Sequence, residues 1–122
     1  MKLIQIYECL CDETRLRILN LLSVTPLCVS HLQKILDLPQ VKISKHLTYM
    51  KERGMVEATR CDSWMLYALT KTTCPELESN LKCLQDCSRE YPIFVKDLNA
   101  LKTVLKEVEK IKEKALQNTH EG

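Results

Sequence analysis

Glycine and proline are scarce in this chain, which contains two glycines and four prolines among its 122 residues. Chain breaks are therefore few, and we expect mostly helices joined by short loops. The sequence also has no glycine-rich phosphate loop, no Cys-x-x-Cys motif, and too few histidines and clustered carboxylates for an acid–base site. An enzyme is accordingly the function class that we expect least.

Long apolar runs are absent as well, since none approaches the roughly 20 residues of a membrane-spanning helix. The first residues, Met1 to Glu8, lack the apolar region and the cleavage site of a signal peptide. We therefore expect a cytoplasmic protein with no membrane partner. The length predicts one domain, 1–122, whose modest core dimerisation could supplement.

Cysteine, by contrast, is abundant, with seven residues in the chain. The odd number excludes complete pairing within one chain, and a reducing cytoplasm keeps thiols free. The cysteines therefore indicate metal or metalloid ligation, redox sensing or simple packing.

Apolar periodicity predicts the order of the elements. We expect helices over residues 2–11, 13–22, about 31–37 and 40–53, strands over 55–59 and 64–69, and helices over about 75–89 and 93–116. Asp12 is placed to cap the second helix. Ser30 and Gln33 have the spacing of a capping box for the third. Gly54 is the residue expected just past the end of the fourth helix.

This order predicts a mainly α fold with a small β-hairpin wing, the winged helix-turn-helix. The helix-turn-helix covers about 30–53, the wing about 55–69 with its tip at 60–63, and C-terminal dimerisation helices about 75–116. The last helix carries an apolar stripe that a lone small domain would struggle to cover, so we expect a homodimer. The stripe consists of Leu98, Leu101, Leu105, Val108 and Ile111.

The fourth helix is the predicted recognition helix, because the second helix of such a pair enters the major groove of DNA. Its core stripe is Ile43, Leu47 and Met50. The opposite face combines charged and polar side chains, namely Gln40, Lys42, Ser44, Lys45, His46 and Tyr49. Arg60 at the expected wing tip could reach a flanking phosphate or the minor groove.

Local charge supports this interpretation, although the net charge of the whole chain is only +2. Five Lys and Arg but two Asp and Glu lie between Gln40 and Arg60, a local charge of +3. Cations placed there would neutralise phosphates and release counterions. The alternative is a merely solvated helix face, because charge patterning alone is a weak signal.

Four segments resemble the ArsR/SmtB family of winged-helix metalloregulators, in collinear order from about Ile4 to Thr70. They are CDETRLRIL from Cys11, PLCVSHL from Pro26, VKISKHL from Val41 and WMLYAL from Trp64. The resemblance implies a homodimeric repressor, with the first and C-terminal helices at the interface. A two-fold dimer predicts an inverted-repeat DNA operator. The resemblance also implies that ligand binding relieves repression.

The sequence departs from the metal sites best known in that family. The arsenic site there has a Cys-Val-Cys-Asp-Leu-Cys pattern, whereas the matching residues here are Cys28, Ser30 and Gln33. The zinc-sensing members use paired Asp and His on the C-terminal helix. Here His31, His46 and His120 show no such pairing, so neither site is expected in its familiar form.

Cys83 and Cys87 are the expected inducer ligands, because an i, i+4 spacing places both on one helix face. A third thiolate could come from Cys11 or Cys9. Trivalent arsenic is a soft centre that favours two or three thiolates, which makes it the expected inducer, and no other cofactor is required. The alternatives are a dithiol sensor of redox or reactive sulfur species, packing cysteines, and a protein-interaction module that does not bind DNA.

Overall fold

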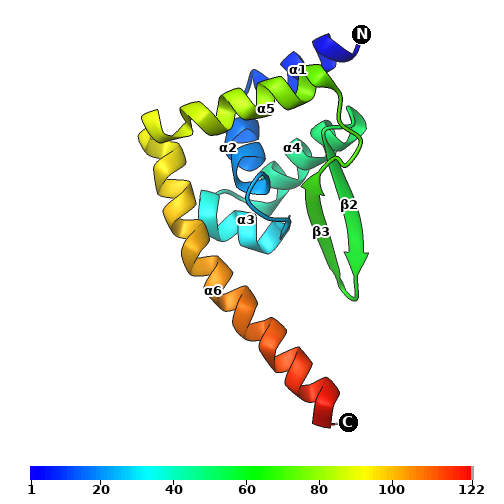
Figure 1. Ribbon diagram of the computed structural model, residues 1–122, viewed down its shortest axis with the longest axis vertical. Coiled ribbons are helices and arrows are strands. Elements are labelled where there is room, and N and C mark those ends of the chain that lie inside the picture. Colours follow the sequence, from blue (N-terminus) through cyan, green and yellow to red (C-terminus); the bar gives the residue numbers. More distant parts are fainter. Residues whose placement is uncertain (122) are drawn as a thin grey trace.

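The computed structural model describes the backbone of residues 1–121 and the side chains of residues 1–107 and 109. It confirms the predicted fold class, a mainly helical winged helix-turn-helix (Figure 1). The elements in chain order are α1 (Lys2–Leu10), α2 (Glu13–Leu22), β1 (Leu27–Cys28), α3 (Val29–Leu36), α4 (Gln40–Glu52), β2 (Val56–Cys61), β3 (Trp64–Leu69), α5 (Pro75–Cys87), a 3-10 turn η1 (Ser88–Glu90) and α6 (Pro92–Glu121).

The local signals for α2 and α4 are confirmed. The Asp12 carboxylate accepts a hydrogen bond of 3.0 Å from the backbone N–H of Arg15 and so caps α2. The stripe on α4 is fully buried, with Ile43, Leu47 and Met50 all 0% exposed. Gly54 follows α4 with φ of 74°, a conformation that only glycine adopts without strain.

The start of α3 differs from the prediction. The helix begins at Val29 rather than near His31, and no side chain caps it, so the predicted capping box of Ser30 and Gln33 is wrong. The Ser30 hydroxyl is engaged elsewhere, 3.1 Å from Sγ of Cys28. Two residues ahead of the helix form β1, which pairs antiparallel with β3 through Leu27 and Tyr67.

The wing is a three-stranded antiparallel sheet in the order β1-β3-β2. β3 has the predicted bounds, but β2 runs closer to the tip than predicted, because Arg60 pairs with Met65 and Cys61 with Trp64. The tip is therefore Asp62 and the following serine, and Asp62 has a left-handed φ of 55°. Arg60 consequently lies in β2, in the second residue pair from the tip, rather than in the tip itself.

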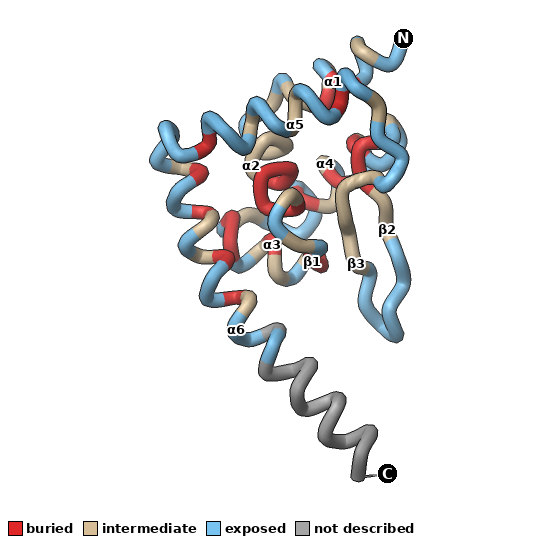
Figure 2. The backbone as a smooth tube through the Cα atoms, in the orientation of Figure 1, coloured by how far each residue is buried: buried red, intermediate tan, exposed pale blue. Residues whose placement is uncertain are grey.

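The core lies around α2, whose last turns are buried and which contacts α1, α4, α5, α6 and β3 (Figure 2). An ion pair joins α2 to α6, because both nitrogens of the Arg17 fork donate to Asp97 at 2.8 Å. The α5 helix crosses the molecule beside α1 and α2 (Figure 1). It ends at Cys87, slightly earlier than expected, because the 3-10 turn η1 begins at the next residue.

The apolar stripe of α6 packs on the protomer's own core over its first half. Leu101 is 2% exposed, and Leu98 and Leu105 are partly buried against the same cluster. Val108 and Ile111 lie outside the described side chains. The helix itself continues beyond the predicted end at Leu116. No helix among the described residues combines the length and the apolar character that crossing a membrane requires.

Candidate nucleic-acid interface and thiol groove

The open face of α4 presents short polar and cationic side chains. Gln40, Lys42 and Lys45 are exposed, and Ser44 is half-buried beside them. Burial of the opposite stripe fixes this orientation, because residues spaced three or four apart share one face of a helix. Arg60 is also exposed on the wing, where its Nε lies 3.4 Å from the carbonyl oxygen of Asp62.

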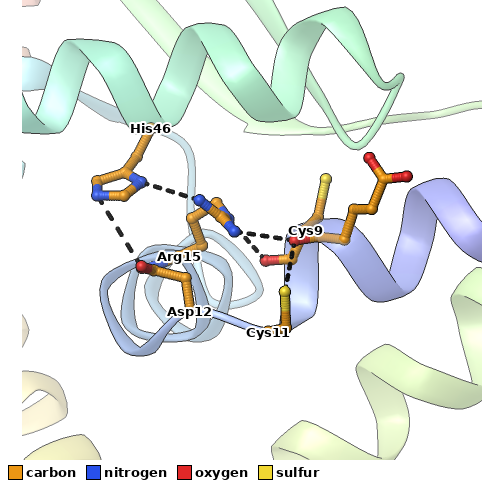
Figure 3. A network of polar contacts seen from close by, with 6 residues as sticks. Cys9, Cys11, Asp12, Arg15 and His46 are labelled. Atoms are coloured by element: carbon orange, nitrogen blue, oxygen red, sulfur yellow. Dashed lines mark hydrogen bonds and ion pairs between the residues drawn. The ribbon is translucent and has the colours of Figure 1, made fainter.

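His46 and Tyr49 are half-buried at the edge of this face, and Tyr49 lines the same surface hollow as Gln40, Ser44 and Lys45. His46 faces the junction of α1 and α2 (Figure 3), where its Nδ1 is 3.4 Å from the Arg15 guanidinium. The Tyr49 ring contacts two cations, with the Cζ atoms of Arg15 and Arg53 at 4.3 and 3.4 Å from its centroid. Sequence spacing could not show this, because it does not reveal which neighbour covers the edge of a stripe.

Burial lowers the pKa of His46 below its ordinary value of 6.5, and the nearby Arg15 and Lys42 charges lower it further against the opposing effect of Asp12. The imidazole is therefore neutral near pH 7. A neutral ring can accept a hydrogen bond from Arg15 at Nδ1, 3.4 Å away, while its Nε2 lies 4.0 Å from Oδ1 of Asp12.

The thiols of Cys11, Cys83 and Cys87 line one groove of about 640 Å³ between the α1–α2 junction and α5. The groove walls are otherwise mainly apolar, formed by Leu10, Leu16, Leu84, Tyr91, Ile93 and Phe94, with Asp12, Glu13 and Asn80 at the polar side. All three cysteines are exposed and none is in a disulfide. The predicted helical pair and one of the two suggested third thiols thus share a surface.

The neighbouring Cys83 thiol affects the pKa of Cys87 directly. Hydrogen bonding with the Cys83 thiol, and then the charge that Cys83 would carry, raises the pKa of Cys87 above its ordinary value. A pKa raised in this way keeps the Cys87 thiol largely protonated at neutral pH.

Cys9 does not reach this groove. Its side chain is 0% exposed and belongs to the core cluster, and burial raises its pKa although Arg15 and Arg53 oppose the effect. In the part of the chain whose side chains are described, no three His, Cys, Asp or Glu residues stand close enough together to hold a metal ion. A three-thiolate site therefore requires Cys11 to move toward α5.

Two further groups were not singled out as functional from the sequence. Cys28 is buried, and its Sγ lies 3.1 Å from Nδ1 of His31. Arg15 stands within the segment that resembles the known family, yet nothing in its spacing indicates that it binds the carbonyls ending α1. Those contacts are the 3.0 Å bond to Cys9 and the 2.9 Å bond to Glu8.

Comparison with known proteins agrees with this geometry. Residues 12–58 match the profile described as bacterial regulatory protein, arsR family. The arsenic resistance transcriptional regulator ArsR1 of Pseudomonas putida is 33% identical over 87 residues, which cover 70% of this chain and 68% of that protein. The arsenical resistance operon repressor of Escherichia coli is 43% identical over 68 residues, or 55% of this chain and 58% of that one. The chain thus spans little more than half of the latter.

A solved structure shows the same fold. The homodimeric winged helix-turn-helix DNA-binding domain from Mycobacterium bovis aligns with a TM-score of 0.61 and 21% identity, covering 75% of this chain and 82% of that one. The relative from Pseudomonas putida, matched over two thirds of its length, extends the agreement beyond the fold. The chain therefore belongs to the arsR family of bacterial transcriptional regulators.

Proposed function

We propose that this protein is a homodimeric transcriptional repressor of the cytoplasm that leaves its operator when trivalent arsenic binds its thiols. The observation that carries the proposal is the groove whose lining includes Cys11, Cys83 and Cys87. The names of the two curated relatives, both arsenic resistance regulators, support the choice of inducer.

The DNA-binding surface is the open face of α4 together with the wing. We assign Gln40 and Ser44 to base edges, and Lys42 and Lys45 to phosphates, because the N-terminal part of such a helix enters the major groove. Arg60 reaches the flanking backbone or the minor groove. The contacts of His46 and Tyr49 favour a role in holding α4 in place behind this surface.

Exposed apolar side chains support the homodimer. Ile4 and Tyr7 on α1 are 54% and 53% exposed, and Tyr91 and Val95 around the start of α6 are 54% and 39% exposed. Large apolar groups in this number favour burial against a second copy. A two-fold dimer presents two α4 helices, so the operator is an inverted repeat with half-sites about one or two helical turns apart.

The chemistry of capture needs no oxidant and no prior ionisation. Arsenous acid exchanges its hydroxyl groups for thiols: As(OH)₃ and three R–SH give As(SR)₃ and three waters. Cys83 and Cys87 can make the first two arsenic–sulfur bonds by rotamer changes on α5, releasing two waters. Cys11 makes the third bond and must approach α5 to do so. Binding then favours a different groove geometry from the free one, which is the condition for shifting DNA affinity.

The test is release of DNA from cysteine variants. A labelled duplex selected from a random-sequence pool by the wild-type protein serves as the operator, and fluorescence anisotropy follows its release by arsenite. Cys83→Ser and Cys87→Ser should bind DNA normally but need far more arsenite for release. Cys11→Ser should show a smaller shift. Cys61→Ser removes an exposed thiol that does not line the groove and should keep the arsenite sensitivity of wild type.

Two outcomes would contradict the proposal. Equal arsenite sensitivity of Cys83→Ser, Cys87→Ser and wild type would place the inducer site elsewhere. Release by peroxide but not by arsenite would favour the dithiol sensor, in which Cys83 and Cys87 form a disulfide and peroxide becomes two waters. The closeness of these two thiols is the observation that keeps this second candidate in view.

A further inference from the structure

The carbonyl oxygen of Glu8, near the end of α1, accepts two hydrogen bonds. One comes from Sγ of Cys11 at 3.2 Å, and the other from Nη2 of Arg15 at 2.9 Å. Cys11 is also a wall of the thiol groove. A groove thiol and the Arg15 guanidinium are thus joined through one backbone oxygen.

Arg15 binds two of the carbonyls at the end of α1. The last carbonyls of a helix lack partners within the helix, and α1 has no basic residue in its last turn. The Arg15 fork supplies the missing donors, because its Nε also donates to the carbonyl of Cys9 at 3.0 Å. The position of the α1–α2 junction, which includes Cys11, therefore depends on this side chain.

The same guanidinium contacts the recognition helix. Its Nη1 lies 3.4 Å from Nδ1 of His46 (Figure 3). Its Cζ lies 4.3 Å from the centre of the Tyr49 ring. Asp12, beside Cys11, lies 4.0 Å from Nε2 of His46. His46 and Tyr49 project from α4, whose next face carries Lys45. The Arg15 side chain thus contacts both the α1–α2 junction at the groove and α4, the helix that we propose binds DNA.

We infer that Arg15 is a positioning residue that couples the thiol groove to the recognition helix, an inference that rests on the proposed function. When Cys11 bonds to arsenic, its thiol hydrogen leaves in water and the Glu8 carbonyl loses that donor. The junction is drawn toward Cys83 and Cys87, and Arg15 moves with the carbonyls that it holds. His46 and Tyr49 then lose their alignment with it, which reorients α4.

The experiment compares DNA affinity with and without saturating arsenite, using the selected duplex. For wild type the ratio of the two dissociation constants should be about 5- to 150-fold. Arg15→Lys keeps the charge but loses the planar fork, which cannot be replaced by a single ammonium. It should still bind arsenite by calorimetry, while the ratio falls by about 2- to 30-fold.

Controls separate coupling from folding. Arg89→Lys is a matched substitution at an exposed position of η1 and should keep the wild-type ratio. His46→Gln removes the α4 end of the contact and should lower the ratio as well, which keeps the test decisive should Arg15→Lys fold poorly. Thermal unfolding followed by circular dichroism shows whether each variant is folded.

The results distinguish the inference from the function on which it rests. Wild type that keeps its DNA in arsenite would overturn both. Wild type that releases DNA, together with Arg15→Lys and His46→Gln variants that release it by the same factor, would leave the repressor intact and overturn the coupling role.

Discussion

The ion pair between α2 and α6 offers a sharp test of what holds the fold together. The Asp97 side chain is 0% exposed and that of Arg17 is 12% exposed, and two bonds of 2.8 Å join them. Asp97→Ala leaves the guanidinium without its acceptor in a largely buried place. Breaking one half of such a pair costs about 3–5 kcal/mol.

The magnitude can be translated into a melting temperature. Unfolding entropy near 60 °C is about 2.1 cal/mol/K per residue, or roughly 0.26 kcal/mol/K for a chain of this length. The Asp97→Ala variant should therefore melt about 12–20 °C below wild type. Thermal unfolding followed by circular dichroism at equal protein concentration measures the shift, since the proposed dimerisation would make melting depend on concentration.

Two comparisons make the reasoning refutable. Glu107→Ala removes the partner of Lys34 in an exposed pair, at 3.3 Å with both side chains more than half exposed, and should stay within about 1 kcal/mol of wild type. Replacing both Arg17 and Asp97 by Met and Leu should recover most of the lost stability, because a buried pair contributes little beyond an apolar one. If Asp97→Ala melted no lower than Glu107→Ala, the assigned importance of this pair would be wrong.

Three further outcomes follow from the surfaces described. Lys45→Ala should weaken DNA binding and lower the slope of log affinity against log salt by about one unit per subunit, whereas Lys102→Ala on α6 should not. Because burial lowers the pKa of His46, the unfolded chain binds more protons below pH 6.5, so urea titration should show stability falling from about pH 7 to about pH 5.5, less steeply in His46→Gln. Sedimentation should find a dimer that Ile4→Glu dissociates; a wild-type monomer that still binds DNA tightly would contradict the interface.

Features that depend on near neighbours in the chain could be predicted from the sequence. The Asp12 cap, the α4 stripe and the glycine after α4 each act within one or two helical turns, so local spacing specifies them. The two-residue strand β1 could not be predicted, because it exists only through pairing with β3, almost 40 residues away in the chain. The start of α3 differs from the prediction for the same reason, because the helix begins directly after β1.

The thiol site shows the same division. The i, i+4 spacing predicted that Cys83 and Cys87 share a face, and both line the groove. Choosing between Cys9 and Cys11 required the exact end of α1. The helix ends at Leu10, so Cys9 still points into the core while Cys11 lies past the last turn, at the groove. Helix ends are the least certain part of any sequence-based prediction.

Arg15 and Arg17 illustrate what spacing can and cannot decide. Two residues apart on a helix, they are rotated by about 200° and must face different neighbours. The sequence does not reveal that α4 covers one side and α6 the other, so it cannot say which arginine serves regulation and which stability. In the structure, Arg15 contacts His46 of α4 and Arg17 contacts Asp97 of α6. The two roles should therefore separate. Loss of the Asp97 contact should lower the melting temperature with little change in the arsenite response. Arg15→Lys should lower the arsenite response with little change in the melting temperature.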